Sequence, residues 1–217
     1  MKIEEAARKV QNFEDGSLTD RLSRFELNSQ GMGANQIKKL CANNKLDSTL
    51  LAGAFKLKRI AGQINVVIHA TGILASLPFI LNEGEKIEYL SLGAGNTGKQ
   101  FDLETTHRIA EFKFINWKGG PESIRQNSLF KDFFGLAEKR TEKKKYLYVL
   151  GLEKPLKFFN GKRKLESVMS KNNALQIKFK SLFASRFSVV SEYYKFRKND
   201  VRIVDIAPVL PELTEFI

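Results

Sequence analysis

The stretch that decides the fold is Arg108-Ile109-Ala110-Glu111-Phe112-Lys113-Phe114-Ile115-Asn116-Trp117, an alternating and largely apolar run in a chain of 217 residues. Successive side chains of a β-strand point to opposite faces of the sheet. The run would therefore place Glu111 and Lys113 on one face and Phe112 and Phe114 on the other. A strand this apolar is typical of the centre of a sheet. Because buried charges are costly unless they are paired or bind a metal ion, an acid and a lysine side by side on it require a reason.

The residues on both sides of this strand predict a mixed sheet flanked by helices. Before it, a helix begins at Asp47 or Ser48, either of which can cap it, and keeps helical spacing to Pro78, with a break near Gly72. The further elements expected are strands at 86–92, 99–105, 146–150 and 201–206, a helix at 121–140 and a mainly helical stretch at 155–198. This order indicates an α/β or α+β protein with a mixed central β-sheet, of which we favour α/β.

We expect one domain over residues 1–217, since neither an internal repeat nor a Pro/Gly/Ser-rich linker divides the chain. Residues 1–46 would be a helical N-terminal extension, with amphipathic helices at 2–12 and 34–44 separated by a polar, glycine-containing stretch. Residues 47–150 would form the core that carries an active site. Residues 151–217 would form a basic, mainly helical C-terminal part with a short final strand.

The basic residues are concentrated in one part of the chain. The whole sequence has 36 Lys and Arg against 24 Asp and Glu, a formal net charge of +12. Residues 118–200 contain 20 of these basic residues and 8 of the acids, so the entire excess lies in this segment and the rest of the chain is neutral. Such a segment indicates either binding of a polyanion, most often nucleic acid, or a solvated basic face.

The composition excludes several classes of protein. One cysteine, Cys41, and two histidines, His69 and His107, cannot form a four-ligand zinc site of the Cys/His kind or an internal disulfide framework. The N-terminus has no signal-like apolar region, and the lack of disulfides suits the cytoplasm. The uncharged stretch 61–82 contains several polar side chains, two glycines and a proline, so we expect a buried helix and no membrane span.

A glycine-rich loop before the second expected strand has two readings. Gly93-Ala94-Gly95-Asn96-Thr97-Gly98-Lys99 fits the first seven positions of a phosphate-binding loop. That motif next requires Ser or Thr to hold magnesium, followed by a helix whose N-terminus faces the phosphates. Here the next residue is Gln100, and residues 101–105 alternate like a strand. We therefore expect a glycine-rich connection between strands.

Asp102 and Glu111 offer a different chemistry. On neighbouring strands their carboxylates can approach one point, and such oxygen ligands suit Mg²⁺, which typically binds one or two carboxylates, waters and phosphate oxygens. Lys113 beside them can orient a water molecule and offset phosphate charge, as metal-assisted phosphodiester hydrolysis requires. The alternative is a buried ion pair between Lys113 and one of the two acids. A second match, Glu142-Lys143-Lys144, lies in a charged run and is expected to be a solvated helix end or turn.

At Asp102, Glu111 and Lys113 the sequence resembles the PD-(D/E)XK nuclease superfamily, which has the restriction-endonuclease-like fold. The resemblance covers residues 47–150, where helix, three-strand meander, helix and strand follow one another, and Phe101 stands where the family has proline. It implies a restriction-endonuclease-like core and a Mg²⁺- or Mn²⁺-dependent deoxyribonuclease, which hydrolyses phosphodiester bonds. Asp102, Glu111 and the backbone carbonyl of Phe112 would bind the metal ion, and Lys113 would position the attacking water.

The resemblance also implies a role for Gln126. Some branches of the family carry Gln-x-x-x-Tyr on the helix after the strands, and this chain has Gln126 with Phe130 in place of the tyrosine. Because Gln126 shares a helical stripe with apolar residues, its amide would contact the metal site or a substrate phosphate, or else be satisfied by backbone. The preceding helix, which sometimes supplies a further acid, has none between Thr49 and Asn82, and His69 there stays unassigned.

DNA is the favoured substrate, and the alternatives are RNA or a non-catalytic nucleic-acid-binding protein on the same fold. An endonuclease of restriction or phage-defence systems is an analogy at the level of fold, and cutting both strands would favour a homodimer. The basic side chains expected to contact the phosphate backbone are Lys118, Arg125, Lys139, Arg140, Lys143, Lys144, Lys145, Lys162, Arg163 and Lys164. Phe158, Phe159, Tyr193 and Tyr194 would stack on bases or, the commoner case, belong to the core.

Overall fold

The computed structural model describes residues 1–14, 16–93, 100–114 and 122–216. These residues form two compact units, Met1–Asn65 and Val66–Ile217. Helix α4 (Ser48–Ile80) contains the boundary between the units. The glycine-rich loop expected between the first two strands lies outside the described residues from 94 to 99, as does the end of the third expected strand.

The first unit consists of helices α1 (Ile3–Glu14), α2 (Leu18–Ser29) and α3 (Ala34–Asn43) and the beginning of α4. Helices α1 and α3 confirm the two predicted helices, but α2 occupies the stretch that we expected to be a polar connection. Ser17 caps α2, since its side chain accepts a hydrogen bond from the backbone N–H of Asp20 at 3.3 Å. The ring of Phe25 stacks on that of Phe13 with centroids 6.4 Å apart. The N-terminal cap and the aromatic contact thus favour a helix in this stretch despite its polar composition.

Helix α4 begins where the sequence predicts. The Asp47 carboxylate accepts hydrogen bonds from the backbone N–H groups of Thr49 and Leu50 at 2.9 and 2.8 Å, which satisfies two donors of the first turn. The break expected at Gly72 is wrong, because the helix is continuous to Ile80. A Cβ atom at Gly72 would lie 2.6–2.8 Å from ring carbons of Phe114. Gly72 therefore permits close packing of α4 on the sheet.

Only one face of α4 is buried in the second unit. Ile73, Ser76 and Leu77 are buried, whereas the apolar run 66–68 is 40–51% exposed and Phe79 is 65% exposed. We expected a buried helix over 61–82. The helix is confirmed, but many of its apolar side chains are exposed. By length and composition, α4 is the one helix within the described residues that could cross a membrane. Those two properties are shared by core helices of soluble proteins, so they do not fix its location.

A mixed five-stranded open sheet forms the centre of the second unit, with strands in the order β1-β2-β3-β4-β5. The strands are β1 (Ile87–Leu90), β2 (Leu103–Thr105), β3 (Arg108–Lys113), β4 (Lys144–Val149) and β5 (Arg202–Asp205). The first three are antiparallel and the last three are parallel. Helix α5 (Glu122–Ala137) connects β3 to β4, as parallel neighbours require. The chain is thus α/β, with β3 at the centre of the sheet.

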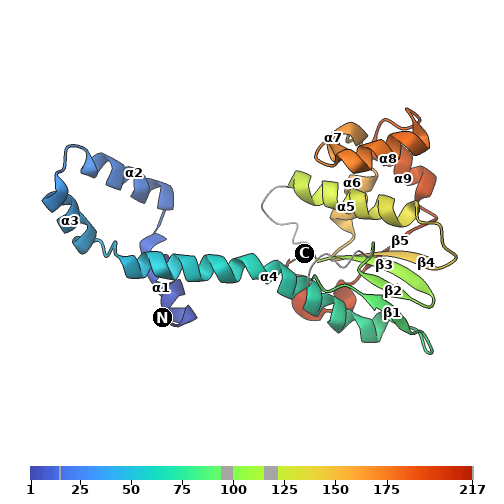
Figure 1. Ribbon diagram of the computed structural model, residues 1–217, viewed down its shortest axis with the longest axis horizontal. Helices are drawn as coiled ribbons and strands as arrows, with labels where there is room; N and C mark the ends of the chain where they lie inside the picture. Colours follow the sequence, from blue (N-terminus) through green and yellow to red (C-terminus); the bar gives the residue numbers. More distant parts are fainter. Residues whose placement is uncertain (15, 94–99, 115–121, 217) are drawn as a thin grey trace. The chain divides into compact units, whose positions relative to one another are not determined.

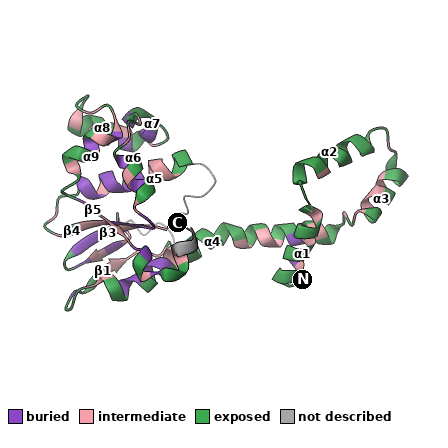
Figure 2. Cartoon of the chain, turned by 180° about the vertical axis from the view of Figure 1, so that it is seen from behind, coloured by how far each residue is buried: buried purple, intermediate pink, exposed green. Residues whose placement is uncertain are grey.

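Helices cover both faces of the sheet in the second unit (Figure 1). On one face lie α5, α6 (Glu153–Phe159), α7 (Leu165–Met169), α8 (Asn173–Phe183) and α9 (Val190–Arg197). On the other lie the end of α4 and the short 3₁₀ helices η1 (Ala207–Val209) and η2 (Pro211–Phe216). Buried residues are concentrated in the strands and in the helix faces that meet them (Figure 2).

The alternation predicted for β3 is confirmed by two separate cores. Ala110 and Phe112 pack with Ile73 and Leu77 of α4, whereas Ile109 packs with residues of α5. Glu111 and Lys113 share the face of Ile109, because strand side chains repeat every second residue. The charged pair therefore points toward α5.

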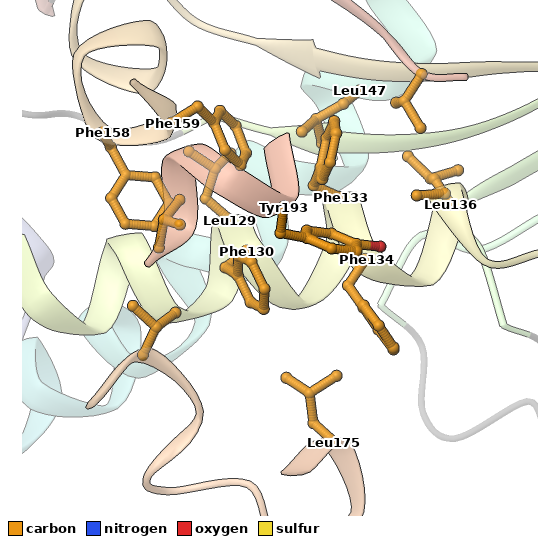
Figure 3. Packing of buried hydrophobic residues seen from close by; sticks show 14 of the residues in the cluster. Leu129, Phe130, Phe133, Phe134, Leu136, Leu147, Phe158, Phe159, Leu175 and Tyr193 are labelled. Carbon is orange, nitrogen blue, oxygen red and sulfur yellow. The ribbon is translucent and has the colours of Figure 1, made fainter. Parts of the chain in front are cut away.

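The core beneath α5 is aromatic (Figure 3). Tyr193 of α9 lies among Phe130, Phe133 and Phe134 of α5, with ring centroids 5.7, 6.2 and 5.8 Å away. Such edge-to-face and tilted pairs are favourable beyond their buried area. The rings considered for base stacking at 158, 159, 193 and 194 all belong to this core or pack against it, which confirms the commoner of the two interpretations.

A buried ion pair fixes the start of β3. Arg108 donates from Nε and Nη2 to the carboxylate of Glu85, each at 2.6 Å, and from Nη1 to the hydroxyl of Tyr148 at 2.8 Å. Thr105 donates to the same carboxylate at 2.5 Å. Burial alone would raise the pKa of Glu85, but the hydrogen bonds from Arg108 and Thr105 outweigh it and lower the pKa to about 2.

Replacing Glu85 with alanine is expected to lower the free energy of unfolding by about 3–5 kcal/mol, because the guanidinium of Arg108 would stay buried without its partner. The folded pKa of Glu85 lies below its ordinary value of 4.5, so this stabilisation is present above pH 4.5 and lost as the pH falls toward about 2. Urea unfolding from neutral to acid pH measures the effect, with exposed Glu83→Ala as the control. If the difference in free energy of unfolding between wild type and Glu85→Ala stayed constant as the pH was lowered to about 2, this expectation would be contradicted.

Candidate active site

Asp102 is held against the middle of β3. It directly precedes β2, and the antiparallel register pairs Leu103 with Ala110. The Oδ2 atom of Asp102 accepts a hydrogen bond from the backbone N–H of Phe112 at 2.9 Å. The side chain of Glu111 lies close enough to lower the pKa of the Asp102 carboxyl group. The two acids predicted from the sequence are therefore brought together, although Asp102 lies one residue before the strand in which we expected it.

The pKa values of the two carboxyl groups are shifted in opposite directions. Burial, followed by the nearby carboxylates of Asp132 and Asp102, raises the pKa of Glu111 to about 10. Burial would also raise the pKa of Asp102, but hydrogen bonds from His69, Glu111 and the N–H of Phe112 outweigh it, so this pKa is lowered. Glu111 is therefore the member of the pair that favours the protonated form, and Asp102 is the member that favours the ionised form. A neighbouring negative charge disfavours ionisation of the second carboxyl group, and a cation between the two would remove that penalty.

Lys113 has a partner that the sequence analysis did not identify. Its Nζ atom lies 2.5 Å from Oδ2 of Asp132, a residue of α5 that is only 8% exposed. Burial would lower the pKa of Lys113, but the Asp132 carboxylate outweighs it and raises the pKa. The ammonium group therefore stays charged. An ion pair of Lys113 was expected as the alternative to a catalytic role, but its partner is Asp132 and not Asp102 or Glu111.

His69 is the second side chain that sequence reasoning missed. Its Nε2 atom lies 3.3 Å from Oδ1 of Asp102, and its ring lies edge-on to that of Phe114. Helical spacing carried a signal, because His69 is four residues before Ile73 on the face of α4 that meets the sheet. For Asp132 the signal was an acid inside the aromatic run 129–134.

Gln126 lies in a different environment from the carboxyl pair. Its Nε2 donates to Glu122 at 2.8 Å, and its Oε1 accepts a hydrogen bond from Arg163. Phe130, which stands in the tyrosine position of the family motif, is fully buried in the aromatic core. The amide is thus satisfied by side chains, where we expected either the metal site or backbone. A contact between Gln126 and a substrate phosphate stays a prediction.

The basic residues predicted to contact DNA differ in how available they are. Lys143 is paired with Glu88 and Glu104 at 2.5 and 2.8 Å, and the Nζ of Lys145 donates to a backbone carbonyl at 3.0 Å. Arg163 binds the Gln126 amide and Arg125 is half-buried, whereas Lys118 lies outside the described residues. The predicted basic side chains that are exposed are Lys139, Arg140, Lys144, Lys162 and Lys164.

The chemistry of the carboxyl pair fits a divalent cation. Among the residues that the structure describes, no three His, Cys, Asp or Glu side chains converge on one point as a ready-made metal site. Mg²⁺, however, typically uses only one or two carboxylates and completes its octahedron with water and substrate oxygens. Asp102 and Glu111 are two neighbouring carboxyl groups of the kind that could serve as such ligands.

Comparisons of this chain with protein-family models, with curated proteins and with solved structures gave no match.

Proposed function

We propose that this protein is a metal-dependent nuclease that hydrolyses phosphodiester bonds of DNA on a restriction-endonuclease-like core. The observation that carries the proposal is the cluster on β3. Glu111 and Lys113 lie on an otherwise apolar strand, and Asp102, whose Oδ2 accepts the backbone N–H of Phe112, lies beside them. Such an arrangement is costly to bury, and divalent-metal hydrolysis of a phosphodiester is a reaction that uses each of its parts.

The order of elements supports the choice of fold. Helix α4 precedes three antiparallel strands, helix α5 follows them, and β4 then pairs in parallel with β3. This is the order that the family resemblance implies for residues 47–150. Glu111 and Lys113 lie on β3 and Asp102 directly precedes β2, which supports the proposal.

Each side chain has a role that follows from its surroundings. Asp102, Glu111 and the carbonyl of Phe112 would hold Mg²⁺ or Mn²⁺, which when bound polarises a phosphoryl oxygen and lowers the pKa of a bound water. Glu111 would have to be ionised to act as a ligand, and the charge of a bound cation would favour that form. Lys113, kept charged by Asp132, donates hydrogen bonds that orient the attacking water and offset phosphate charge. His69 holds Oδ1 of Asp102 and so fixes the direction of the carboxylate.

The charge distribution supports DNA as the substrate. The cluster lies in a chain whose net charge of +12 comes from residues 118–200. Exposed lysines and arginines within that segment would contact backbone phosphates, whose neutralisation makes binding strongly salt-dependent.

Digestion of DNA with and without a divalent cation tests the proposal. The protein is incubated with plasmid DNA, linear duplex and single-stranded DNA in Mg²⁺ or Mn²⁺, and in EDTA. A Lys113→Ala protein purified in parallel controls for contaminating nucleases. We expect cleavage that needs the cation and is absent from the variant. Salt-sensitive binding of DNA without cleavage in either cation would instead indicate a non-catalytic nucleic-acid-binding protein, and a parallel RNA digest decides the substrate.

A further inference from the structure

A cavity of about 260 Å³ adjoins the carboxyl cluster. Glu111 and Asp132 form part of its wall, and the remainder comes from the residues before β2, from α5 and from the beginning of α8. The cavity is slightly smaller than the about 300–1,000 Å³ of sites for drug-sized ligands. It is therefore suited to one ring system of a larger substrate.

The lining of the cavity combines an apolar floor with amides. Phe101, Phe134 and Leu175, each at most 8% exposed, supply the apolar part. Gln100 and Asn172 supply the amides, and Asn172 is fixed in place because its Oδ1 accepts the backbone N–H of Leu175 at 3.0 Å. A nucleobase has the same combination, with apolar faces and a hydrogen-bonding edge, and enzymes that take a base out of its stack read it in this way.

The charges around the cavity distinguish a base from a phosphate. The carboxylate of Asp132 lies in the wall of the cavity and disfavours an anion inside it. Two exposed lysines, Lys131 and Lys178, also line the cavity, and the Nζ of Lys178 lies 5.7 Å from the ring centroid of Phe134. Cationic groups so placed attract the phosphates on either side of a nucleotide whose uncharged base lies within.

We propose that this cavity binds one unpaired nucleobase of the strand whose phosphodiester lies at Asp102 and Glu111. This inference rests on the proposed function and narrows its substrate to single-stranded or locally unpaired nucleic acid. A base that is stacked and paired in a duplex cannot enter a cavity beside the reacting phosphate, so the enzyme would act on single strands, ends or flipped-out nucleotides.

Gly135 of α5 offers a direct test, because it lines the cavity. A Cβ atom added there would come no closer than 4.0 Å to any neighbour, and those neighbours are Nε2 of Gln100 and Cε1 of Phe101. Leucine at this position would fill the cavity without a clash of its Cβ atom, and alanine is the matched control that removes the glycine but leaves most of the space. Ala174→Trp, at an exposed position on the α8 side, is a second blocking variant should Gly135→Leu unfold.

Binding of a thymidine 12-mer is compared with that of a 12-mer of abasic tetrahydrofuran phosphates by fluorescence anisotropy in EDTA. We expect wild type and Gly135→Ala to bind the thymidine strand about 5- to 150-fold more tightly, which is the range measured for stacking of single bases. In Gly135→Leu and in Ala174→Trp, the ratio of the affinity for the thymidine strand to that for the abasic strand should fall to about 1. The affinity for the abasic strand itself should not change.

Cleavage assays in Mg²⁺ on the same preparations separate the two proposals. An unchanged thymidine-to-abasic ratio in both blocking variants would overturn the base-binding cavity, even if wild type cleaves DNA. Loss of the ratio in the variants, together with a wild type that cleaves nothing, would support the cavity and overturn the nuclease. Preference for single strands over duplex in the wild type, lost in the blocking variants, supports both.

Discussion

Replacing Lys113 with alanine is expected to slow DNA cleavage by about three orders of magnitude. The estimate follows from the about 10²–10⁴-fold contributions of proton-transfer groups and the similar values for single groups that stabilise charge in a transition state. Lys113 stands one strand repeat from Glu111 and is held charged by Asp132 at 2.5 Å, so its ammonium group is fixed before substrate arrives. Single-turnover cleavage of labelled DNA in Mg²⁺ measures the effect, with exposed Lys86→Ala as the control.

The same substitution has a second effect that must be separated from the first. Without Lys113, the carboxylate of Asp132 is left in a nearly closed site, and breaking a buried pair in this way costs about 3–5 kcal/mol of stability. The double variant Lys113→Met/Asp132→Leu removes both charges, and replacing a whole buried pair by apolar residues is often neutral. We expect it to recover the wild-type midpoint of urea unfolding while its cleavage stays lost. A stable double variant that cleaved at the wild-type rate would show that the lysine has a structural role only.

The parts of the fold that follow from local pattern could be predicted from the sequence. The alternation of Arg108–Lys113 gives both the central strand and the face on which Glu111 and Lys113 lie, because strand geometry alone fixes that periodicity. The cap at Asp47 is likewise local, since its carboxylate bonds the next turn of the same helix. Asp102 was found by its distance along the chain from a recognisable strand.

The partners of these residues depend on contacts that pattern does not contain. Asp132 meets Lys113 because α5 packs on the face of β3 that carries Lys113. His69 meets Asp102 from α4, which packs closely on Phe114 at Gly72. Helix α2 was missed for the opposite reason, since its polar composition concealed a cap and an aromatic contact. Composition also overstated the burial of α4, whose apolar residues at 66–68 are about half exposed.

Replacing Glu111 with glutamine is expected to stabilise the metal-free protein while abolishing cleavage. The folded pKa of Glu111, about 10, lies above its ordinary value of 4.5. Between these values the folded protein keeps a proton that the unfolded chain releases, so wild-type stability falls as the pH rises from 4.5 to 10. Glutamine takes up no proton, and its amide can still donate to Asp102. The variant should therefore be more stable by about 2–5 kcal/mol at pH 8, with little difference near pH 5.

Urea unfolding in EDTA across this pH range measures the difference, and exposed Glu83→Gln is the control in which none is expected. A Glu111→Gln protein that was less stable than wild type at pH 8 would contradict the raised pKa of Glu111.

Addition of Mg²⁺ should narrow the difference in stability between wild type and Glu111→Gln at pH 8 if Glu111 is a metal ligand. A cation that binds only the folded protein adds about 2.7 kcal/mol at a hundred times its dissociation constant, and wild type should gain this at pH 8 while the variant gains little. Glu111→Gln should therefore raise the stability of the metal-free protein and lower the stabilisation by Mg²⁺. The substitution removes a carboxyl group that is costly to ionise in the folded protein, and the same group is the proposed metal ligand. If Glu111 had a purely structural role, its replacement would lower the stability of the protein. A variant that is more stable, does not respond to Mg²⁺ and does not cleave DNA therefore identifies Glu111 as part of the site.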